Sequence, residues 1–178
     1  MKENSSKKVK GFLLNSPCEE YSLLLGEKIG TLLEAGDILA LRGELASGKT
    51  LLTRGIARGL GVSPEVRVTS PTFTIINEYQ GRLCLFHLDL YRIAGIDELD
   101  TLPWREALFG SGAAAIEWPD RLGRLLPGGR WDIELSIIDD ENRAILIRGR
   151  GPKNRRRMAK WAEVLDTLRV EAPCQKEE

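Results

Sequence analysis

The segment GELASGKT at residues 43–50 constrains the fold of this chain more than any other feature of the sequence. It matches the pattern G-x-x-x-x-G-K-[ST], in which backbone N–H groups surround phosphate oxygens, the lysine reaches the outer phosphates and the final hydroxyl binds magnesium. The pattern requires a strand before it and a helix after it. Residues 37–43 form a short apolar run typical of a strand, and residues 49–61 have the pattern of a helix ending at a glycine. The sequence therefore predicts a phosphate-binding loop made by Gly43, Glu44, Leu45, Ala46, Ser47, Gly48, Lys49 and Thr50.

The other hydrophobic patterns predict strands and helices around this unit. Strands are expected at residues 12–14, 66–69, 73–79, 83–88, 112–117, 132–138 and 143–148. Helices are expected at residues 17–36 and 155–170, and one or two short helices broken at Pro103 are expected within residues 96–110. Such a mixture favours an α/β fold. We expect a three-layer fold like that of P-loop NTPases, with a mixed, mostly parallel central sheet and helices on both faces.

Length and composition favour one domain. The chain has 178 residues, of which 42% are hydrophobic. This is enough for a substantial core that needs no disulfide bonds or metal ions to stabilise it. We expect this P-loop domain at residues 11–170, including a basic helix at about 155–170, with polar flexible tails at residues 1–10 and 171–178.

Charge and cysteine content predict a cytoplasmic protein. Lys and Arg together number 26, as do Asp and Glu, so no overall field would draw the chain to nucleic acid or a membrane. The first residues contain only a very short apolar run, which predicts neither a signal peptide nor a membrane span. Three scattered cysteines without a C-x-x-C pair predict ordinary thiols, no zinc site and a reducing compartment.

Two carboxylates follow predicted strands and are candidates for a metal site. Asp89 and Glu117 would both lie at the carboxyl edge of the sheet, where open α/β folds bind ligands. Magnesium at such a loop is held by the Ser or Thr hydroxyl, here Thr50, and often by an acid at a strand end. We assign Glu117 to the metal, and Asp89 to a water-mediated metal contact or to orienting the attacking water. A helix cap or a surface ion pair is the open alternative for each.

Several neighbouring residues have more than one possible role. Thr72, in SPTFT at residues 70–74, is a candidate switch hydroxyl for the magnesium or the terminal phosphate, unless this segment simply starts a strand. His87 is the only histidine, which excludes acid–base chemistry built on a histidine pair, and its apolar strand favours a core role over a ligand role. Trp118 could exclude water from the site or simply pack in the core.

Positive charge is concentrated in one region near the C-terminus. Residues 142–162 contain no Asp or Glu, whereas they include Arg143, Arg148, Arg150, Lys153, Arg155, Arg156, Arg157 and Lys160. These side chains could contact tRNA phosphates or an acidic partner, although a solvated helix face is the commoner meaning of such a run.

Taken together, the motifs resemble the TsaE (YjeE) family of ATPases. The resemblance runs from about residue 20 to residue 148 and is carried, in order, by LGEKIG, GELASGKT, RGIARGLG, SPTFTIINEY, FHLDLYR and IEWP. It implies ATP and Mg²⁺ as cofactors, slow hydrolysis by the chain alone, and action with the TsaB–TsaD heterodimer. That pair transfers a threonylcarbamoyl group to the adenosine beside the anticodon of tRNAs that read codons beginning with A.

The resemblance also implies roles for individual residues. Lys49 and Thr50 would bind phosphate and magnesium, and Glu117 would be the second metal ligand. Asp89 would be important in catalysis, Thr72 would be a switch residue, and Ser22 would lie near the adenine. The resemblance further implies a protein that is monomeric alone and that can contact tRNA through the complex.

The sequence departs from the family pattern in two places: within the glycine loop, and at the basic helix after Arg148, which lies outside the resemblance. The family loop usually reads G-D-L-G-A-G-K-T, whereas Glu44 and Ala46 stand here, and we expect Ala46 to avoid positive φ with little loss. Two alternative functions also stay open at this stage. A small nucleotide or metabolite kinase would share the loop and a basic segment. A non-catalytic module that uses ATP only for assembly would share the binding groups. A GTPase is disfavoured because no N-K-x-D motif accompanies the D-x-x-G match at residues 120–123.

Overall fold

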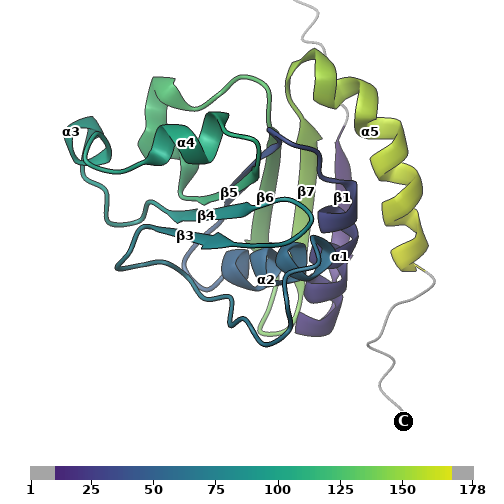
Figure 1. The fold of residues 1–178 in the computed structure, drawn as a ribbon. Helices are drawn as coiled ribbons and strands as arrows, with labels where there is room; N and C mark the ends of the chain where they lie inside the picture. The colour runs from purple at the N-terminus through teal and green to yellow at the C-terminus, as the bar shows by residue number, and fades with distance from the viewer. Residues whose placement is uncertain (1–10, 170–178) are drawn as a thin grey trace, which may run out of the picture.

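A seven-stranded mixed sheet with the strand order β1-β7-β6-β2-β5-β4-β3 forms the middle of the molecule (Figure 1). The structure is a computed structural model and describes residues 11–169. The strands are β1 (Phe12–Ser16), β2 (Ile38–Arg42), β3 (Ile76–Tyr79), β4 (Leu85–Asp89), β5 (Ala113–Glu117), β6 (Trp131–Ile137) and β7 (Arg143–Gly149). The helices are α1 (Glu19–Leu32), α2 (Lys49–Gly59), α3 (Ile96–Leu99), α4 (Trp104–Phe109) and α5 (Gly151–Asp166), with 3-10 turns η1 (Pro119–Leu125) and η2 (Thr167–Arg169).

The centre of the sheet is parallel and its flanks are antiparallel. β2 pairs in parallel with β5 and β6, and β5 pairs in parallel with β4. β3, β7 and β1 add antiparallel strands at the two sides. The predicted mixed α/β fold is therefore confirmed, and β2, β5 and β4 place their carboxyl ends at one edge.

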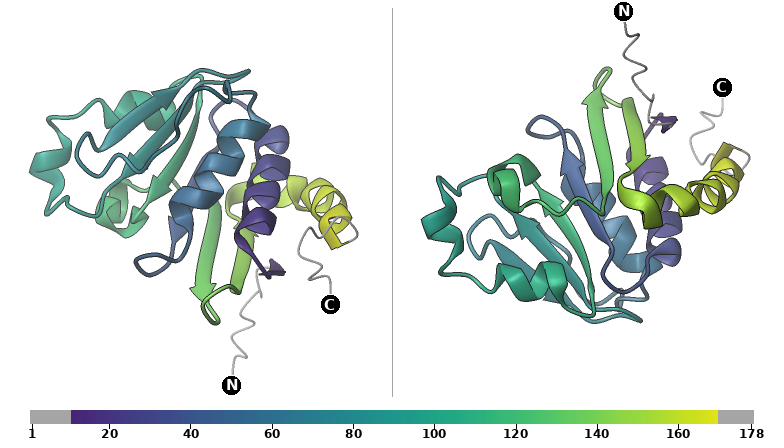
Figure 2. Two further views of the ribbon diagram at one scale, coloured as in Figure 1. Left: turned by 90° about the horizontal axis from the view of Figure 1, so that it is seen from below. Right: turned by 90° about the horizontal axis from the view of Figure 1, so that it is seen from above.

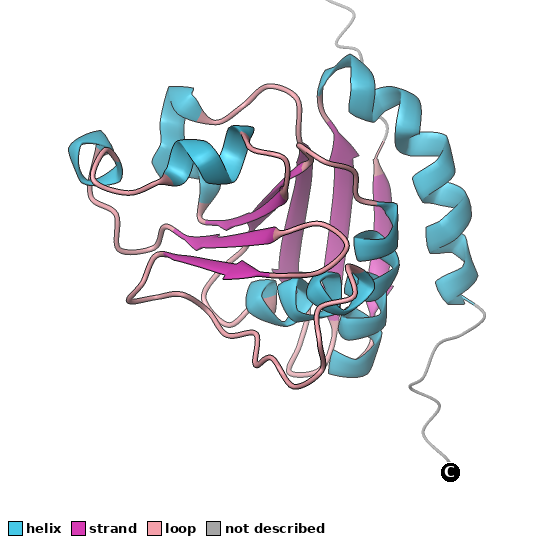
Figure 3. Ribbon diagram, viewed as in Figure 1, coloured by secondary structure: helices cyan, strands magenta, loops and turns pink. Residues whose placement is uncertain are grey.

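Helices cover both faces of the sheet (Figure 3). Successive strand residues point to opposite faces, so Leu39 of β2 packs in a core with α1 and α2, while Ile38 packs in a second core with α4 and η1. α5 lies beside α1 (Figure 2). Its Trp161 stacks on Trp131 of β6, with ring centroids 3.6 Å apart. Figure 2 also shows α1 and α2 side by side on one face.

Four glycines let α1 and α2 touch along their backbones, and this contact fixes the position of α2. A Cβ on Gly26 would lie 2.4 Å from the Leu52 carbonyl oxygen, and one on Gly59 would lie 2.0 Å from the Glu27 carbonyl oxygen. Gly30 and Gly55 are equally crowded. Any side chain at these positions would push the helices apart, and with them the loop that precedes α2.

Some expected elements differ from the structure. No strand forms at residues 66–69. β3 begins at Ile76, because the chain pairs with β4 only from that residue onward. In the intervening segment Val68 is buried, whereas 46% of Val66 and 83% of Phe73 are exposed. α5 begins at Gly151, four residues before the predicted start. The two predicted tails lie outside the described residues.

The cysteines differ in part from the expectation of ordinary thiols. Cys84 is free, whereas Cys18 is not a free thiol, and Cys174 lies outside the described residues. Within residues 11–169, none of the helices is both long enough and apolar enough to span a membrane.

Candidate phosphate-binding site

The glycine loop, residues 43–50, connects β2 to α2 through backbone conformations that favour glycine. Gly48 has φ +99° and precedes the first residue of α2. Gly43 has φ +151°, and a Cβ there would lie 2.4 Å from Ser47 Oγ and 2.5 Å from the Leu135 carbonyl oxygen. Ala46 also has a positive φ, +61°, contrary to the expectation that it would avoid this region. The loop closes tightly at this point, so its geometry overrides the preference of alanine.

Lys49 is the first residue of α2, and its side chain turns back over the loop. Its Nζ donates to the carbonyl oxygens of Gly43 at 3.0 Å and Glu44 at 2.7 Å, and to Ser47 Oγ at 3.4 Å. Burial lowers the pKa of Lys49, and the carboxylates of Glu117 and Asp89 oppose this shift only in part. The ammonium therefore lies in a partly desolvated position where an anion would interact with it strongly.

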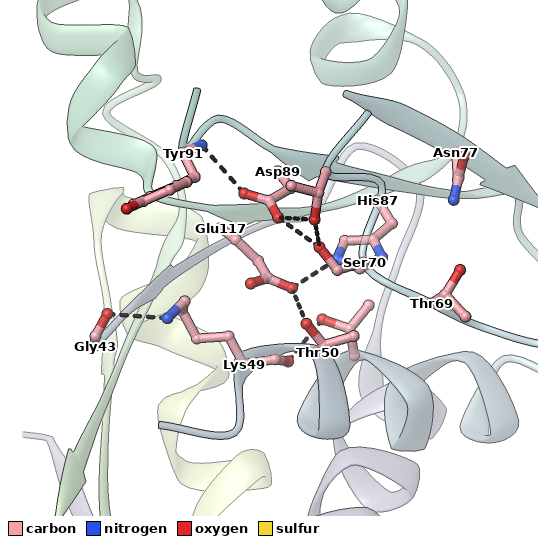
Figure 4. Close-up of polar contacts among 12 residues, drawn as sticks. Gly43, Lys49, Thr50, Thr69, Ser70, Asn77, His87, Asp89, Tyr91 and Glu117 are labelled. Carbon is pink, nitrogen blue, oxygen red and sulfur yellow. Dashed lines mark hydrogen bonds and ion pairs between the residues drawn. The ribbon is translucent and has the colours of Figure 1, made fainter. Parts of the chain in front are cut away.

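The two predicted carboxylates are brought together by the sheet (Figure 4). Asp89 and Glu117 are the last residues of β4 and β5 and are directly opposite each other in the parallel pairing. Both are buried. Glu117 Oε1 accepts hydrogen bonds from Thr50 Oγ1 at 2.8 Å and from His87 Nε2 at 2.9 Å. The candidate metal ligands Thr50 and Glu117 are thus already in contact.

Asp89 is joined to the segment between α2 and β3. Its Oδ2 accepts hydrogen bonds from Ser70 Oγ and, at 3.4 Å, from Thr72 Oγ1, and these two hydroxyls are 2.8 Å apart. Its Oδ1 accepts a hydrogen bond from the Tyr91 backbone N–H at 3.1 Å. The predicted switch hydroxyl of Thr72 therefore lies beside Asp89, and Ser70, which the sequence did not single out, makes the stronger link.

A cavity of about 390 Å³ opens between the loop and the ends of β4 and β5. It is lined by Leu45, Ala46, Gly48, Lys49, Thr50, Leu51, Ser70, Thr72, Asp89, Tyr91, Arg92, Glu117 and Trp118. Most predicted site residues thus surround one cavity. Gly43, Glu44 and Ser47 lie behind it and contact Lys49 instead. Ser22 is buried in α1, 2.7 Å from Ser16 Oγ, and does not line the cavity.

Aromatic side chains form one wall of this cavity. Trp118 lies in the left-handed region, with φ +57°, directly after Glu117. Lys49 Nζ lies 4.6 Å from the centroid of the Trp118 ring, and the Tyr91 ring packs against Trp118 at 5.1 Å. Trp118 therefore covers the lysine, and it also packs against the core beside α4 and η1, so its position is compatible with both roles considered from the sequence.

The oxygen donors around the cavity suit magnesium rather than a softer metal. Thr50, Asp89 and Glu117 supply one hydroxyl and two carboxylates, which are hard ligands. In residues 11–169 no three His, Cys, Asp or Glu side chains are grouped closely enough to form a complete metal site. An ion here would need further oxygens, and magnesium commonly takes these from phosphates and water.

Much of the basic C-terminal region is used within the molecule. Arg157 donates two hydrogen bonds to Asp37, at 2.7 and 2.8 Å, and Lys153 lies 3.2 Å from Glu34. Arg150 and Arg148 pair with Asp132 and Glu134, and Arg143 donates to carbonyl oxygens of its own turn. Arg155, Arg156 and Lys160 remain, exposed and without an ion pair in the described part of the chain. Any basic surface is therefore smaller than the sequence suggested.

The fold and site define an α/β protein with a glycine loop between a parallel strand and a helix. Residues 17–145 match the family model described as "Threonylcarbamoyl adenosine biosynthesis protein TsaE". The chain therefore belongs to the TsaE family of threonylcarbamoyl adenosine biosynthesis proteins.

Individual relatives agree with this assignment. The chain is 41% identical over 122 residues to the tRNA threonylcarbamoyladenosine biosynthesis protein TsaE of Treponema pallidum, covering 68% of this chain and 89% of that one. It is 42% identical over 111 residues to the protein of the same name in Bacillus subtilis, covering 62% and 68%. A crystal structure of Bacillus subtilis YdiB matches with a TM-score of 0.74 and 31% identity, covering 91% of this chain and 98% of that one.

Proposed function

We propose that this protein is a P-loop ATPase that binds and slowly hydrolyses Mg-ATP to drive or reset a TsaB–TsaD complex. In this proposal that complex modifies tRNAs that read codons beginning with A, in the cytoplasm, and this chain can contact tRNA through the complex. One observation carries the proposal: Lys49, Thr50, Asp89 and Glu117, which come from three separate elements, surround a single cavity.

The loop and α2 account for phosphate binding. Backbone N–H groups at the start of a helix attract anions, and the first residue of α2 is Lys49 itself. Its ammonium is held at the loop by carbonyl oxygens, so it is already positioned for the outer phosphates. Leu45 and Ala46 form the outer wall of the cavity. The fixed loop geometry means that little reorganisation is needed on binding.

The carboxylates account for hydrolysis. Thr50 and Glu117 would hold Mg²⁺, which when bound neutralises charge on the phosphates. Asp89 can accept a hydrogen bond from a water molecule in the cavity, and its links to Ser70 and Thr72 fix its direction. The rings of Trp118 and Tyr91 pack together at the cavity, where in this proposal they would shield part of the site from bulk water. Slow turnover by the chain alone fits a site whose completion depends on a partner.

A kinase would need an acceptor site next to the phosphates, beside the cavity at residues 43–50. A second cavity, of about 350 Å³, is lined by α2 and by residues 62–68. It shares no lining residue with the cavity at the loop. This second cavity is therefore separate from the candidate phosphate site and is not placed to hold an acceptor for it.

Phosphate release from ATP by the purified chain, alone and with the TsaB–TsaD pair, tests the proposal. We expect the pair to raise the rate well above the sum of the separate rates, and Glu117→Ala to abolish it. Glu163→Ala, the same change at an exposed residue of α5, should leave the rate unchanged. Unaltered release with the pair, together with ATP consumption when small hydroxylated acceptors are added, would instead identify a kinase. Nucleotide binding without any phosphate release would identify a non-catalytic assembly module.

A further inference from the structure

His87 is completely buried in β4 and directed toward the candidate metal site (Figure 4). It is two residues from Asp89 on the same strand, so both side chains point to the face that α2 covers. Its Nε2 lies 2.9 Å from Glu117 Oε1. Its Nδ1 has no hydrogen-bond partner among the described residues.

The hydrogen bond to Glu117 fixes which nitrogen carries the proton. Glu117 Oε1 already accepts from the Thr50 hydroxyl, and a carboxylate oxygen can only accept. Nε2 must therefore donate. The opposite tautomer would place a lone pair against the carboxylate and would also bury an unpaired N–H at Nδ1.

This arrangement is costly for a residue that only fills space. A buried imidazole with one unsatisfied nitrogen loses hydration that an aliphatic side chain would not lose. The neighbouring β4 residues, Phe86 and Leu88, show that the strand otherwise uses apolar side chains. The loss of imidazole hydration is explained if the Nε2–H group has a function at Glu117.

We propose that His87 is a positioning residue that fixes the Glu117 carboxylate for Mg²⁺ binding. This inference rests on the proposed function, because it assumes that Glu117 and Thr50 bind the ion. Thr50 would itself be a metal ligand, so His87 is the one described side-chain donor to Glu117 that lies outside the ligand set. By holding Oε1, it leaves Oε2 directed toward the side of Lys49 (Figure 4).

Partners of this kind are known to affect metal binding strongly. Removing a group that orients a metal ligand commonly weakens metal affinity by about 10- to 100-fold. The effect should appear in the magnesium dependence of nucleotide binding rather than in nucleotide binding itself, because His87 does not line the cavity.

Two substitutions at His87 separate positioning from packing. His87→Leu keeps an apolar body of similar size but has no donor. His87→Gln has a side-chain amide that can reach Glu117 Oε1 in place of Nε2. For each variant and the wild type, binding of a non-hydrolysable ATP analogue is measured in EDTA and during a Mg²⁺ titration at constant ionic strength.

We expect His87→Leu to bind the analogue in EDTA within about twofold of wild type but to need about tenfold more Mg²⁺ for half-saturation. His87→Gln should need no more than about threefold more Mg²⁺. An unchanged magnesium requirement in His87→Leu, or equal losses in both variants with and without Mg²⁺, would overturn the inference. If wild type itself shows no magnesium-dependent binding, the proposed function fails first, and the inference with it.

A measurement on the wild-type chain keeps the inference testable if the variants do not fold. Because the chain has a single histidine, imidazole ¹⁵N resonances belong to His87 alone once any purification tag is removed. We expect the Nε2–H signals of a neutral ring or of a ring protonated at both nitrogens. A neutral ring protonated only at Nδ1 could not donate to Glu117 and would overturn the inference.

Discussion

Two groups of buried carboxylates in this molecule are stabilised in opposite ways. At the cavity, Glu117 and Asp89 accept hydrogen bonds from hydroxyls, an imidazole and a backbone N–H. Away from it, Asp37 is paired with Arg157, and Asp132 is surrounded by arginines. The first group keeps its negative charge available, whereas the charge of the second is neutralised within the protein.

The arginine-paired group joins distant parts of the chain. Asp132 accepts hydrogen bonds from Arg42 at 3.0 Å, Arg130 at 2.7 Å and Arg150 at 2.6 Å. Arg157 also donates to the Leu32 carbonyl oxygen at 2.7 Å and so ties α5 to the end of α1. A carboxylate in such a cluster has little affinity left for a metal ion, so its role is structural.

Backbone strain follows the same division. In residues 11–169 the non-glycine residues with positive φ are Ala46, Ile75 and Trp118. Ala46 and Trp118 line the cavity, and Ile75 accepts a hydrogen bond at its carbonyl oxygen from the Asp89 backbone N–H, at 3.0 Å. Strained conformations persist where the surrounding structure enforces them, and they commonly cluster at functional sites. The difference between the two regions suggests that one has been shaped for binding and the other for stability.

The largest effect is expected at the pair between α5 and the body of the domain. Arg157→Leu leaves Asp37, of which 2% is exposed, without its main counter-charge. Removing one partner of a buried ion pair costs about 3 kcal/mol or more in the free energy of unfolding. Urea denaturation measures this loss, and Arg156→Leu, at an exposed neighbour, should change it by less than about 0.5 kcal/mol. Equal effects of the two substitutions would show that the pair does not stabilise the fold.

Glu117→Gln should lower activity and leave stability nearly unchanged, the opposite of the effect expected for Arg157→Leu. The amide oxygen can still accept from Thr50 and His87, so we expect the free energy of unfolding to change by less than about 1 kcal/mol. Under the proposed function, the loss of negative charge should lower the rate of ATP hydrolysis by about 100-fold. Glu163→Gln is the matched control. A large loss of stability with normal hydrolysis would contradict the division between the two groups.

Asp132 should contribute to the acid dependence of stability. Burial alone would raise its pKa, but hydrogen bonds from Arg150, Arg130 and Arg42 outweigh burial, and the pKa in the folded protein is lowered. The stabilisation is therefore present above the unfolded pKa of about 4 and is lost as pH falls through the lower, folded pKa.

The substitution Asp132→Asn tests this effect. At pH 7 it should lower the free energy of unfolding by about 1 kcal/mol, a modest figure because Arg42 and Arg150 are partly solvated. The gap to wild type should narrow below about pH 4. Asp140→Asn, in an exposed turn, should show no such gap. A gap that stays constant down to low pH would mean that the charge of Asp132 is not the cause.

The features that sequence could predict are those set by local pattern. The glycine loop between a strand and a helix follows from spacing, and the positions of Asp89 and Glu117 follow from the ends of apolar strands. The structure adds that β4 and β5 are neighbouring strands, which places Asp89 and Glu117 directly opposite each other. Comparison of the chain with known proteins confirms the family, while the roles of the individual site residues stay predictions.

The features that sequence could not predict depend on contacts between distant residues. Asp37 and Arg157 are 120 positions apart. The sequence alone therefore shows a basic segment but not the acidic residues that pair with it. From the sequence, His87 is indistinguishable from a core residue, because its hydrogen bond to Glu117 joins two neighbouring strands that are 30 positions apart in the chain. The positive φ of Ala46 reflects closure of the whole loop, which overrides the local preference of alanine.

The smallest effect is expected from relieving strain at Ala46. With φ +61°, alanine pays a conformational penalty of about 1 kcal/mol that glycine does not, partly offset by the greater freedom of glycine in the unfolded chain. Ala46→Gly should therefore raise the free energy of unfolding by about 0.5 kcal/mol. The same substitution at Ala159, exposed in the middle of α5, should lower it by about 1 kcal/mol. Urea denaturation of the two variants in parallel gives the sign of each effect. If Ala46→Gly destabilises the protein as Ala159→Gly does, the loop is not strained, and the two regions differ in charge alone.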